Sequence, residues 1–97
     1  MIMVTAKIRA KPGEKDNIIA KSKDLLDSSR LESGCVNYNL YASTEDNNLL
    51  LMLEQWANLE VLQSHMQTEH FKAFGKAIED ILAEPMNISV YSAEIKY

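Results

Sequence analysis

The chain has 97 residues, a length that supports one hydrophobic core, so we expect a single domain over residues 1–97. Its formal net charge is −4, and no cluster of lysines and arginines could follow a phosphate backbone, which argues against nucleic acid as a partner. The single cysteine, Cys35, excludes an intrachain disulfide and favours a reducing compartment. No apolar run approaches a signal peptide or a membrane span, so the sequence predicts a cytoplasmic protein that binds no membrane.

The first third of the chain predicts a strand followed by a helix. Apolar and polar side chains alternate over residues 2–10, which is the pattern of a strand with one buried face. Lys11-Pro12-Gly13 breaks this strand, and apolar residues then recur at helical spacing. The spacing predicts a helix from about Glu14 to Leu31, which Ser33-Gly34 ends.

The middle of the chain predicts a hairpin of two strands. Alternation over residues 36–42, with Val36 and Tyr38 on the inner side, indicates the second strand. The polar run 43–48 is typical of a hairpin loop. Residues 49–56 form a third strand that is largely apolar on both sides, so we expect both of its faces to be buried.

Two capped helices and a last strand complete the predicted elements. Asn58 can cap a short helix, and Thr68 can cap a second one that ends before Glu84-Pro85. The apolar residues at helical spacing are Leu59, Leu62 and Met66 in the first helix, and Phe71, Phe74, Ile78, Ile81 and Leu82 in the second. Residues 88–95 carry the pattern of a fourth strand.

The element order β-α-β-β-α-α-β predicts an α+β fold of the ferredoxin-like class. In this arrangement a four-stranded antiparallel sheet carries all its helices on one face. The strand over residues 49–56 needs a cover on its second face, and no helix remains to provide it. A second copy of the chain is the simplest cover, so we predict a homodimer packed sheet to sheet.

The chain lacks the common motifs for nucleotides and zinc. No glycine-rich phosphate loop, Cys-x-x-Cys pair or His-Glu-x-x-His occurs, and the glycines at 13, 34 and 75 are scattered. We therefore expect no cofactor, and these motifs give no reason to expect a metal.

His65 and His70 are the only histidines, and they lie in one short segment. Imidazole is the side chain best suited to proton transfer near neutral pH, which makes both candidates for a catalytic base. On one continuous helix they would lie about 140° apart, but a break near Gln67-Thr68 could bring them together. A metal site would still lack a third ligand, and metal binding, proton transfer and a purely structural role all remain open.

Three further residues are candidates for binding a substrate. Trp56 can fill the core or form the flat side of a pocket for an aromatic ligand. Glu54 shares the same strand face, so its carboxylate is either a buried structural acceptor or a pocket group. Tyr38 is explained more simply as an amphipathic sheet residue than as an acid, and Cys35 as a small buried apolar side chain.

A series of motifs in the second half of the chain is familiar from one family. The motifs are Leu53-Glu54-Gln55-Trp56, Leu62, His65, Gln67-Thr68, His70-Phe71 and Phe74. With Lys11-Pro12-Gly13 and the turn Glu32-Ser33-Gly34-Cys35-x-x-Tyr38, they span nearly the whole chain. The chain resembles the antibiotic biosynthesis monooxygenase (ABM) domain family, especially its small quinol-monooxygenase-like members.

The resemblance implies a dimeric α+β barrel with one pocket in each subunit, between the sheet and the helices. It also implies oxidation of an electron-rich phenol, quinol or polyketide aromatic by O₂ without a cofactor. On that basis His65 or His70 is the base or hydrogen-bond donor, Trp56 lines the pocket, and Glu54 and Tyr38 orient the substrate.

The chain also departs from particular branches of this family. The haem-degrading branch uses an Asn, a Trp and a His where this chain has Lys7, His65 and Gly75, so haem degradation is disfavoured. The polyketide-oxidising branch carries an Asn where this chain has Met52, which places Met52 among the substrate-binding candidates and makes that substrate class doubtful.

Two alternatives to oxygenation remain. A relative that processes a phosphorylated sugar suggests a cofactor-free isomerase of a small carbonyl compound, for which Lys7 and Arg9 are the obvious anion-binding residues. The other is a dimer that binds an aromatic or carbonyl metabolite without catalysis, because a protein can keep its fold after losing the family's catalytic activity.

Overall fold

The structure is a computed structural model that describes residues 1–97. Its elements follow the predicted order and are joined by one added 3₁₀ turn, η1: β1 (Ile2–Arg9), α1 (Lys15–Lys21), α2 (Lys23–Arg30), β2 (Cys35–Ala42), β3 (Leu49–Trp56), α3 (Leu59–His65), α4 (Glu69–Ile78), η1 (Glu79–Ile81) and β4 (Asn87–Ser92). The predicted α+β, ferredoxin-like fold is confirmed. None of these helices has both the length and the apolar character that a membrane crossing requires.

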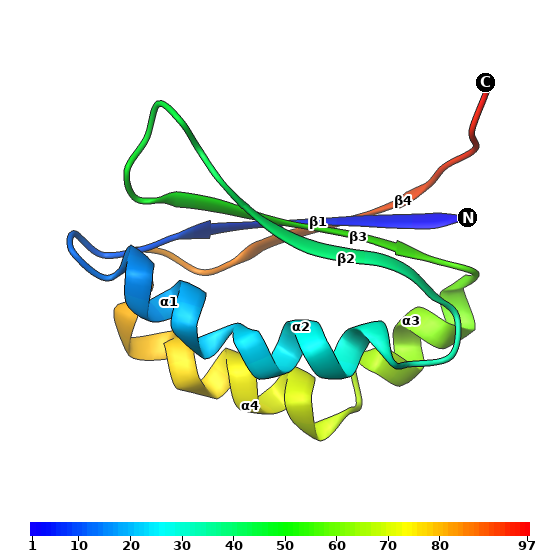
Figure 1. The fold of residues 1–97 in the computed structure, drawn as a ribbon, viewed down its shortest axis with the longest axis horizontal. Coiled ribbons are helices and arrows are strands. Elements are labelled where there is room, and N and C mark those ends of the chain that lie inside the picture. The colour runs from blue at the N-terminus through cyan, green and yellow to red at the C-terminus, as the bar shows by residue number, and fades with distance from the viewer.

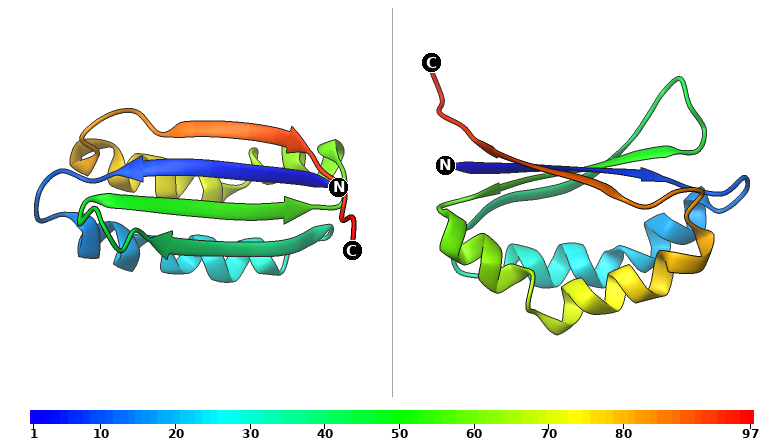
Figure 2. Two further views of the ribbon diagram at one scale, coloured as in Figure 1. Left: turned by 90° about the horizontal axis from the view of Figure 1, so that it is seen from above. Right: turned by 180° about the vertical axis from the view of Figure 1, so that it is seen from behind.

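The four strands form one antiparallel sheet in the order β2-β3-β1-β4. All the helices cover one face of this sheet (Figure 1), and the opposite face carries no helix (Figure 2). The register explains the shared inner face, because Val4, Ala6 and Ile8 of β1 pair with Glu54, Met52 and Leu50 of β3. The alternation that predicted the strands therefore also defines the side that packs against the helices.

The single helix predicted from Glu14 to Leu31 is divided at Ser22 into α1 and α2. The Ser22 hydroxyl donates a hydrogen bond to the Ile19 carbonyl oxygen (2.7 Å), and its backbone N–H reaches the carbonyls of both Ile18 and Ile19. A serine that bonds back to the preceding turn bends a helix. Ser22 is fully buried, so the bend lies against the core.

The break between α3 and α4 agrees with the predicted caps. The Asn58 side chain accepts a hydrogen bond from the N–H of Val61 (3.0 Å), and the Thr68 hydroxyl accepts one from the N–H of Phe71 (3.3 Å). Each cap satisfies a backbone donor that the first turn of a helix leaves free. Because α3 ends at His65 and α4 begins at Glu69, the break places both histidines at neighbouring helix ends.

The predicted burial of both faces of β3 depends on a second copy of the chain and stays a prediction, whereas two other strand predictions were wrong. On β3 the inner residues Leu50, Met52, Glu54 and Trp56 are buried, but Leu49, Leu51 and Leu53 on the other face remain partly exposed within one chain. Val36 was expected to face inward, yet half of it is exposed because a bulge shifts the register between Cys35 and Asn37. The last strand ends at Ser92 rather than at residue 95.

Gly34 fixes the position of the turn between α2 and β2. Its φ is +87°, a conformation that residues with a side chain rarely adopt, and a Cβ atom there would lie 2.8 Å from both Cγ atoms of Val61 in α3. The glycine therefore allows this turn to pack directly on α3.

We predict that Gly34→Ala lowers the free energy of unfolding by about 2–4 kcal/mol, since backbone strain and a steric clash with Val61 act together. Urea unfolding followed by circular dichroism measures this change. Gly13→Ala is the matched control, because Gly13 has a φ of +83° but open space around it, and its cost should be only about 1–2 kcal/mol. Equal losses in the two variants would contradict the proposed contact with Val61.

Candidate functional site

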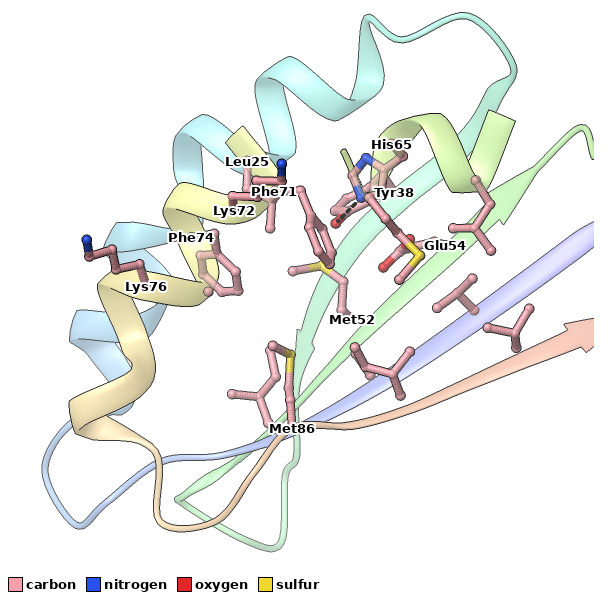
Figure 3. Close-up of a pocket in the computed structure, with 18 of the residues that line it drawn as sticks. Leu25, Tyr38, Met52, Glu54, His65, Phe71, Lys72, Phe74, Lys76 and Met86 are labelled. Carbon is pink, nitrogen blue, oxygen red and sulfur yellow. Dashed lines mark hydrogen bonds between the residues drawn. The ribbon is translucent and has the colours of Figure 1, made fainter. Parts of the chain in front are cut away.

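A cavity of about 430 Å³ lies between the inner face of the sheet and α4 (Figure 3). Hydrophobic residues make up 13 of the 19 that line it, and both its size and its apolar character are typical of small-molecule sites. The side chains of Tyr38, Glu54 and His65 gather at one end of the cavity, whereas Met86 lies at the other (Figure 3). A ligand would therefore meet a largely apolar interior with buried polar groups at one end.

The cavity is open along strand β4, which is an edge strand of the sheet. Ile88 and Val90 of β4 line the cavity and are 43% and 49% exposed. Because apolar side chains surround this opening, it could admit an apolar compound to the cavity.

His65 is the residue at this polar end with the best geometry for proton transfer. Its side chain is only 1% exposed, and it lines the cavity. Nε2 lies 3.3 Å from the hydroxyl oxygen of Tyr38 (dashed line in Figure 3), and Nδ1 lies 2.6 Å from Oε2 of Glu32. Both ring nitrogens therefore have polar partners, one beside the cavity and one behind the ring.

His70 approaches the same carboxylate from the other side. Its Nε2 lies 2.7 Å from Oε2 of Glu32, so one oxygen atom contacts both imidazoles. The ring centroids of the two histidines are 5.9 Å apart, a proximity that the break between α3 and α4 makes possible. However, His70 lines a separate outer groove between α4 and the α1–α2 pair and does not line the cavity.

Glu32 is the residue of the candidate site to which the sequence analysis assigned no role, although it begins a turn that carries the family resemblance. It lies in the turn after α2, where an acidic residue is usually explained by solvation, and neither periodicity nor a motif for chemistry marks it. The available signal was Gly34, whose close approach to Val61 holds this turn against α3 and hence near His65. The expectation that the histidines lack a third ligand is therefore wrong, because Glu32 supplies a carboxylate oxygen.

Trp56 and Glu54 form a pair on the inner face of β3. The indole N–H of Trp56 donates a hydrogen bond to Oε1 of Glu54 (2.9 Å). Glu54 lines the cavity while only 5% exposed, so it is both a buried acceptor and a cavity group. Trp56 is fully buried and does not line the cavity, which differs from the expected contact with the substrate. Its ring instead packs behind His65, with centroids 4.6 Å apart.

Burial sets the protonation states of the polar cavity residues. Desolvation raises the pKa of Glu54 to about 7, although the hydrogen bond from Trp56 opposes this change. Desolvation lowers the pKa of His65 more than its bond to Glu32 raises it, so the imidazole is neutral and able to accept a proton at neutral pH. The pKa of the Tyr38 hydroxyl is raised by burial, so it remains a hydrogen-bond donor.

The remaining candidates divide clearly between the cavity and the surface. Met52 lines the cavity, and its assignment to substrate binding stays a prediction. Arg9 and Lys7 do not line it, and the Arg9 guanidinium already donates to Asp46 (2.8 Å) and Glu84 (2.9 Å). The expected anion site at Lys7 and Arg9 is therefore not part of this cavity. Burial raises the pKa of the Cys35 thiol, which opposes the thiolate form that a nucleophile needs.

Comparison with known proteins points to one family. A family model described as "Antibiotic biosynthesis monooxygenase" matches residues 1–77. A protein of Synechocystis sp. strain PCC 6803 named "Uncharacterized protein sll1783" is 37% identical over 90 residues, which cover 93% of this chain but only 61% of that protein. The Escherichia coli K12 protein named "Probable quinol monooxygenase YgiN" is 28% identical, with 93% of this chain and 95% of the relative covered.

Solved structures agree with the sequence matches. The crystal structure of a conserved protein from Methanosarcina mazei Go1 superimposes with a TM-score of 0.91 at 29% sequence identity. The match covers 96% of this chain and 92% of that protein. The fold is therefore shared over nearly the full length.

The raised pKa of Glu54 leads to a prediction about stability. A carboxyl whose pKa rises from 4.5 to about 7 on folding binds its proton more tightly in the folded state, so stability falls as pH rises through this range. Glu54→Gln removes the charge and keeps an acceptor for Trp56. Between pH 5 and pH 8, we expect its free energy of unfolding to rise relative to the unmodified chain by up to about 3 kcal/mol.

Urea unfolding at several pH values measures this difference. Glu79→Gln is the matched control, because Glu79 also lines the cavity but is exposed, so this replacement removes a lining carboxylate without removing a buried one. A Glu54→Gln variant whose relative stability stays constant between pH 5 and pH 8 would contradict the assigned burial of this carboxyl.

Proposed function

Because this chain belongs to the antibiotic biosynthesis monooxygenase family, we propose that it is a cofactor-independent monooxygenase that oxidises an electron-rich aromatic or quinol-type molecule with O₂. The observation that carries this proposal is the position of His65, whose Nε2 lies at the polar end of an apolar cavity while Glu32 holds Nδ1. The printed name of the Escherichia coli relative supports a quinol as the substrate class.

The cavity suits a flat ring with a hydroxyl group. Met52, Phe71 and Phe74 surround its middle, so an aromatic body would replace water there with favourable contacts (Figure 3). A hydroxyl at one end of the ring would lie near Tyr38, Glu54 and His65. The buried polar groups lie at this single end, where they would orient the substrate, whereas the other charged lining residues, Lys72, Lys76 and Glu79, are exposed.

Glu32 prepares His65 to act as a base. A carboxylate can only accept a hydrogen bond. Its contact with Nδ1 therefore favours the tautomer that carries hydrogen on Nδ1 and a lone pair on Nε2. That lone pair accepts a hydrogen bond from the Tyr38 hydroxyl in the free protein and would accept one from the substrate hydroxyl in the complex. Glu32 also stabilises the imidazolium that forms, in the same way that the aspartate acts in a Ser-His-Asp triad.

The oxidation itself needs little from the protein beyond this proton transfer. The substrate anion passes one electron to O₂, and the resulting radical pair combines to form a carbon–oxygen bond. Loss of water from the peroxide then gives the product, so that a hydroquinone and O₂ yield a hydroxyquinone and one molecule of water. His65 returns its proton to the departing hydroxide, and the apolar cavity keeps bulk water from the intermediates.

The same base could serve an isomerase, which is the second candidate function. His65 with Glu32 behind it could move a proton between two carbons of a carbonyl compound without O₂. A phosphorylated substrate has less support, because Arg9 is already paired with Asp46 and Glu84 and lies outside the cavity. A protein that only binds its ligand would show neither reaction.

We predict that metal-free protein consumes O₂ in the presence of a panel of hydroquinones, and that His65→Ala reduces kcat about 100-fold or more because the base is lost. An oxygen electrode measures the uptake, and parallel assays without O₂ follow substrate loss. Asp24→Asn is the control, since Asp24 lies in the outer groove, and it should retain full activity.

Turnover that continues without O₂ would contradict the oxygenase and support the isomerase. Equal rates for the unmodified chain and His65→Ala would remove His65 from the mechanism. Ligand binding with no turnover in either atmosphere would support a protein that binds without catalysis.

We also propose that the active form is a homodimer formed through the uncovered face of the sheet. Leu49, Leu51 and Leu53 of β3 are partly exposed on this face, and the register places Tyr41 of β2 beside Leu51. No helix of the chain reaches this side (Figures 1 and 2). A matching face from a second copy would remove these leucines from water.

Leu51→Lys should convert the dimer to a monomer, because a charge at the centre of a sheet-to-sheet contact would be buried without a partner. Size-exclusion chromatography with light scattering measures the mass. Leu31→Lys is the matched control, since Leu31 is 87% exposed at the end of α2 and its replacement should leave the mass unchanged. A monomeric unmodified chain, or a Leu51→Lys variant that remains dimeric, would contradict this interface.

A further inference from the structure

We propose that Glu32, His65 and His70 form a binding site for one divalent first-row transition-metal ion, for which Zn²⁺ is a suitable probe. The site lies behind the His65 ring, and His70 connects it to the outer groove. This inference concerns a second ligand and does not rest on the proposed oxygenase reaction.

The three ligand atoms are already close together. Oε2 of Glu32, Nδ1 of His65 and Nε2 of His70 all lie within 4.8 Å of one another. The two oxygen–nitrogen distances are 2.6 and 2.7 Å, whereas ligand atoms around a zinc ion with bonds of about 2.1 Å lie about 3.0–3.4 Å apart. A small outward movement of the carboxylate would therefore admit an ion in place of the hydrogens between Glu32 and the two imidazoles.

The composition of the cluster selects the kind of ion. Two imidazole nitrogens and one carboxylate oxygen suit Zn²⁺, Fe²⁺, Co²⁺ or Ni²⁺, whereas Mg²⁺ and Ca²⁺ prefer oxygen ligands alone. Three protein ligands also leave at least one position for water. The cluster therefore has the donor set of an open transition-metal site.

Three different elements hold the ligands in place. Glu32 comes from the turn that Gly34 packs against α3, His65 from the last turn of α3, and His70 from the first turn of α4. The Thr68 cap fixes the start of α4 directly before His70. Because the backbone positions each ligand independently, an ion would not have to order a flexible loop, which lowers the cost of binding.

The second ring nitrogen of His65 also has a partner that fits metal binding. Metal-bound histidines nearly always use their other nitrogen in a hydrogen bond that fixes the ring. Here Nε2 of His65 lies 3.3 Å from the Tyr38 hydroxyl, which can accept an N–H as readily as it donates its own hydrogen. Tyr38 is thus placed to support His65 as a ligand.

Solvent exposure indicates the route by which an ion would enter. The side chains of Glu32 and His70 are 16% and 22% exposed, whereas His65 is 1% exposed. Of the three, only His65 lines the cavity, and His70 lines the outer groove. The ion would therefore arrive through the outer groove and keep its free coordination position on that side, away from a substrate in the cavity.

An ion at this site would change what His65 presents to the cavity. Coordination at Nδ1 displaces the hydrogen that Glu32 accepts, so the hydrogen of the neutral ring moves to Nε2. His65 would then be a hydrogen-bond donor toward the cavity and no longer a base. Metal binding and proton transfer by His65 are therefore alternative states of one cluster.

Titration of metal-free protein with ZnCl₂ by calorimetry, and with CoCl₂ by visible absorption, tests the site. We expect one ion per chain, and a Co²⁺ spectrum with the d–d bands of nitrogen and oxygen ligands. Glu32→Gln and His70→Ala should each weaken Zn²⁺ binding by at least about 100-fold, and Tyr38→Phe by about 10-fold. Asp24→Asn should bind as the unmodified chain does, because Asp24 lies in the same outer groove but outside the cluster.

Circular dichroism shows whether each variant folds, and His70→Ala, at a partly exposed position, keeps the test valid if Glu32→Gln does not fold. No binding to the unmodified chain, or binding that Glu32→Gln and His70→Ala leave unchanged, would overturn the proposed site. Metal binding by a protein that oxidises no quinol would refute the proposed function but support this site, so the two failures can be distinguished.

Discussion

The organisation of the site depends on one carboxylate oxygen that contacts two histidines. Oε2 of Glu32 lies 2.6 Å from Nδ1 of His65 and 2.7 Å from Nε2 of His70. A buried imidazole with an unpaired nitrogen would cost free energy, so the carboxylate both stabilises His65 and fixes its tautomer. The free nitrogen of His65 is consequently directed to the Tyr38 hydroxyl beside the cavity. The chemistry of the cavity is thus set by a residue that does not line it.

The cavity itself follows from the way the sheet and helices meet. The α1–α2 pair and α4 lie on one side of a four-stranded sheet (Figures 1 and 2), and no helix packs closely against the edge strand β4. Inner residues of β1 and β3 are buried, yet Ile88 and Val90 on β4 stay about half exposed. An incompletely covered inner face leaves a space lined by apolar side chains, and Glu54 shares it because β3 alternates in the same register. The raised pKa of Glu54 is a direct result of this apolar setting.

Periodicity and capping were sufficient to predict most of the fold, because these signals are local in the sequence. Asn58 and Thr68 marked the starts of α3 and α4, and alternation marked the strands. The division of the first helix at Ser22 and the outward turn of Val36 were missed, since both result from hydrogen bonding that periodicity does not encode. Within the site, Tyr38, Met52, Glu54 and His65 line the cavity, whereas Trp56 and His70 lie behind it. Glu32 could not be found by spacing, because its role depends on a contact between a turn and a helix that lie far apart in the sequence.

The position of Trp56 explains why a conspicuous aromatic residue need not touch a ligand. Its ring packs 4.6 Å from the His65 ring, and its N–H binds Glu54, so it contacts both polar groups of the cavity from behind. A smaller residue would leave space there, and both side chains could then rotate away from their positions at the end of the cavity. Glu32 and Trp56 therefore act alike: each restrains His65 or Glu54 from outside the cavity, which leaves the interior free for an apolar ligand. Such supporting residues hold the imidazole of His65 and the carboxyl of Glu54 in fixed positions beside the cavity.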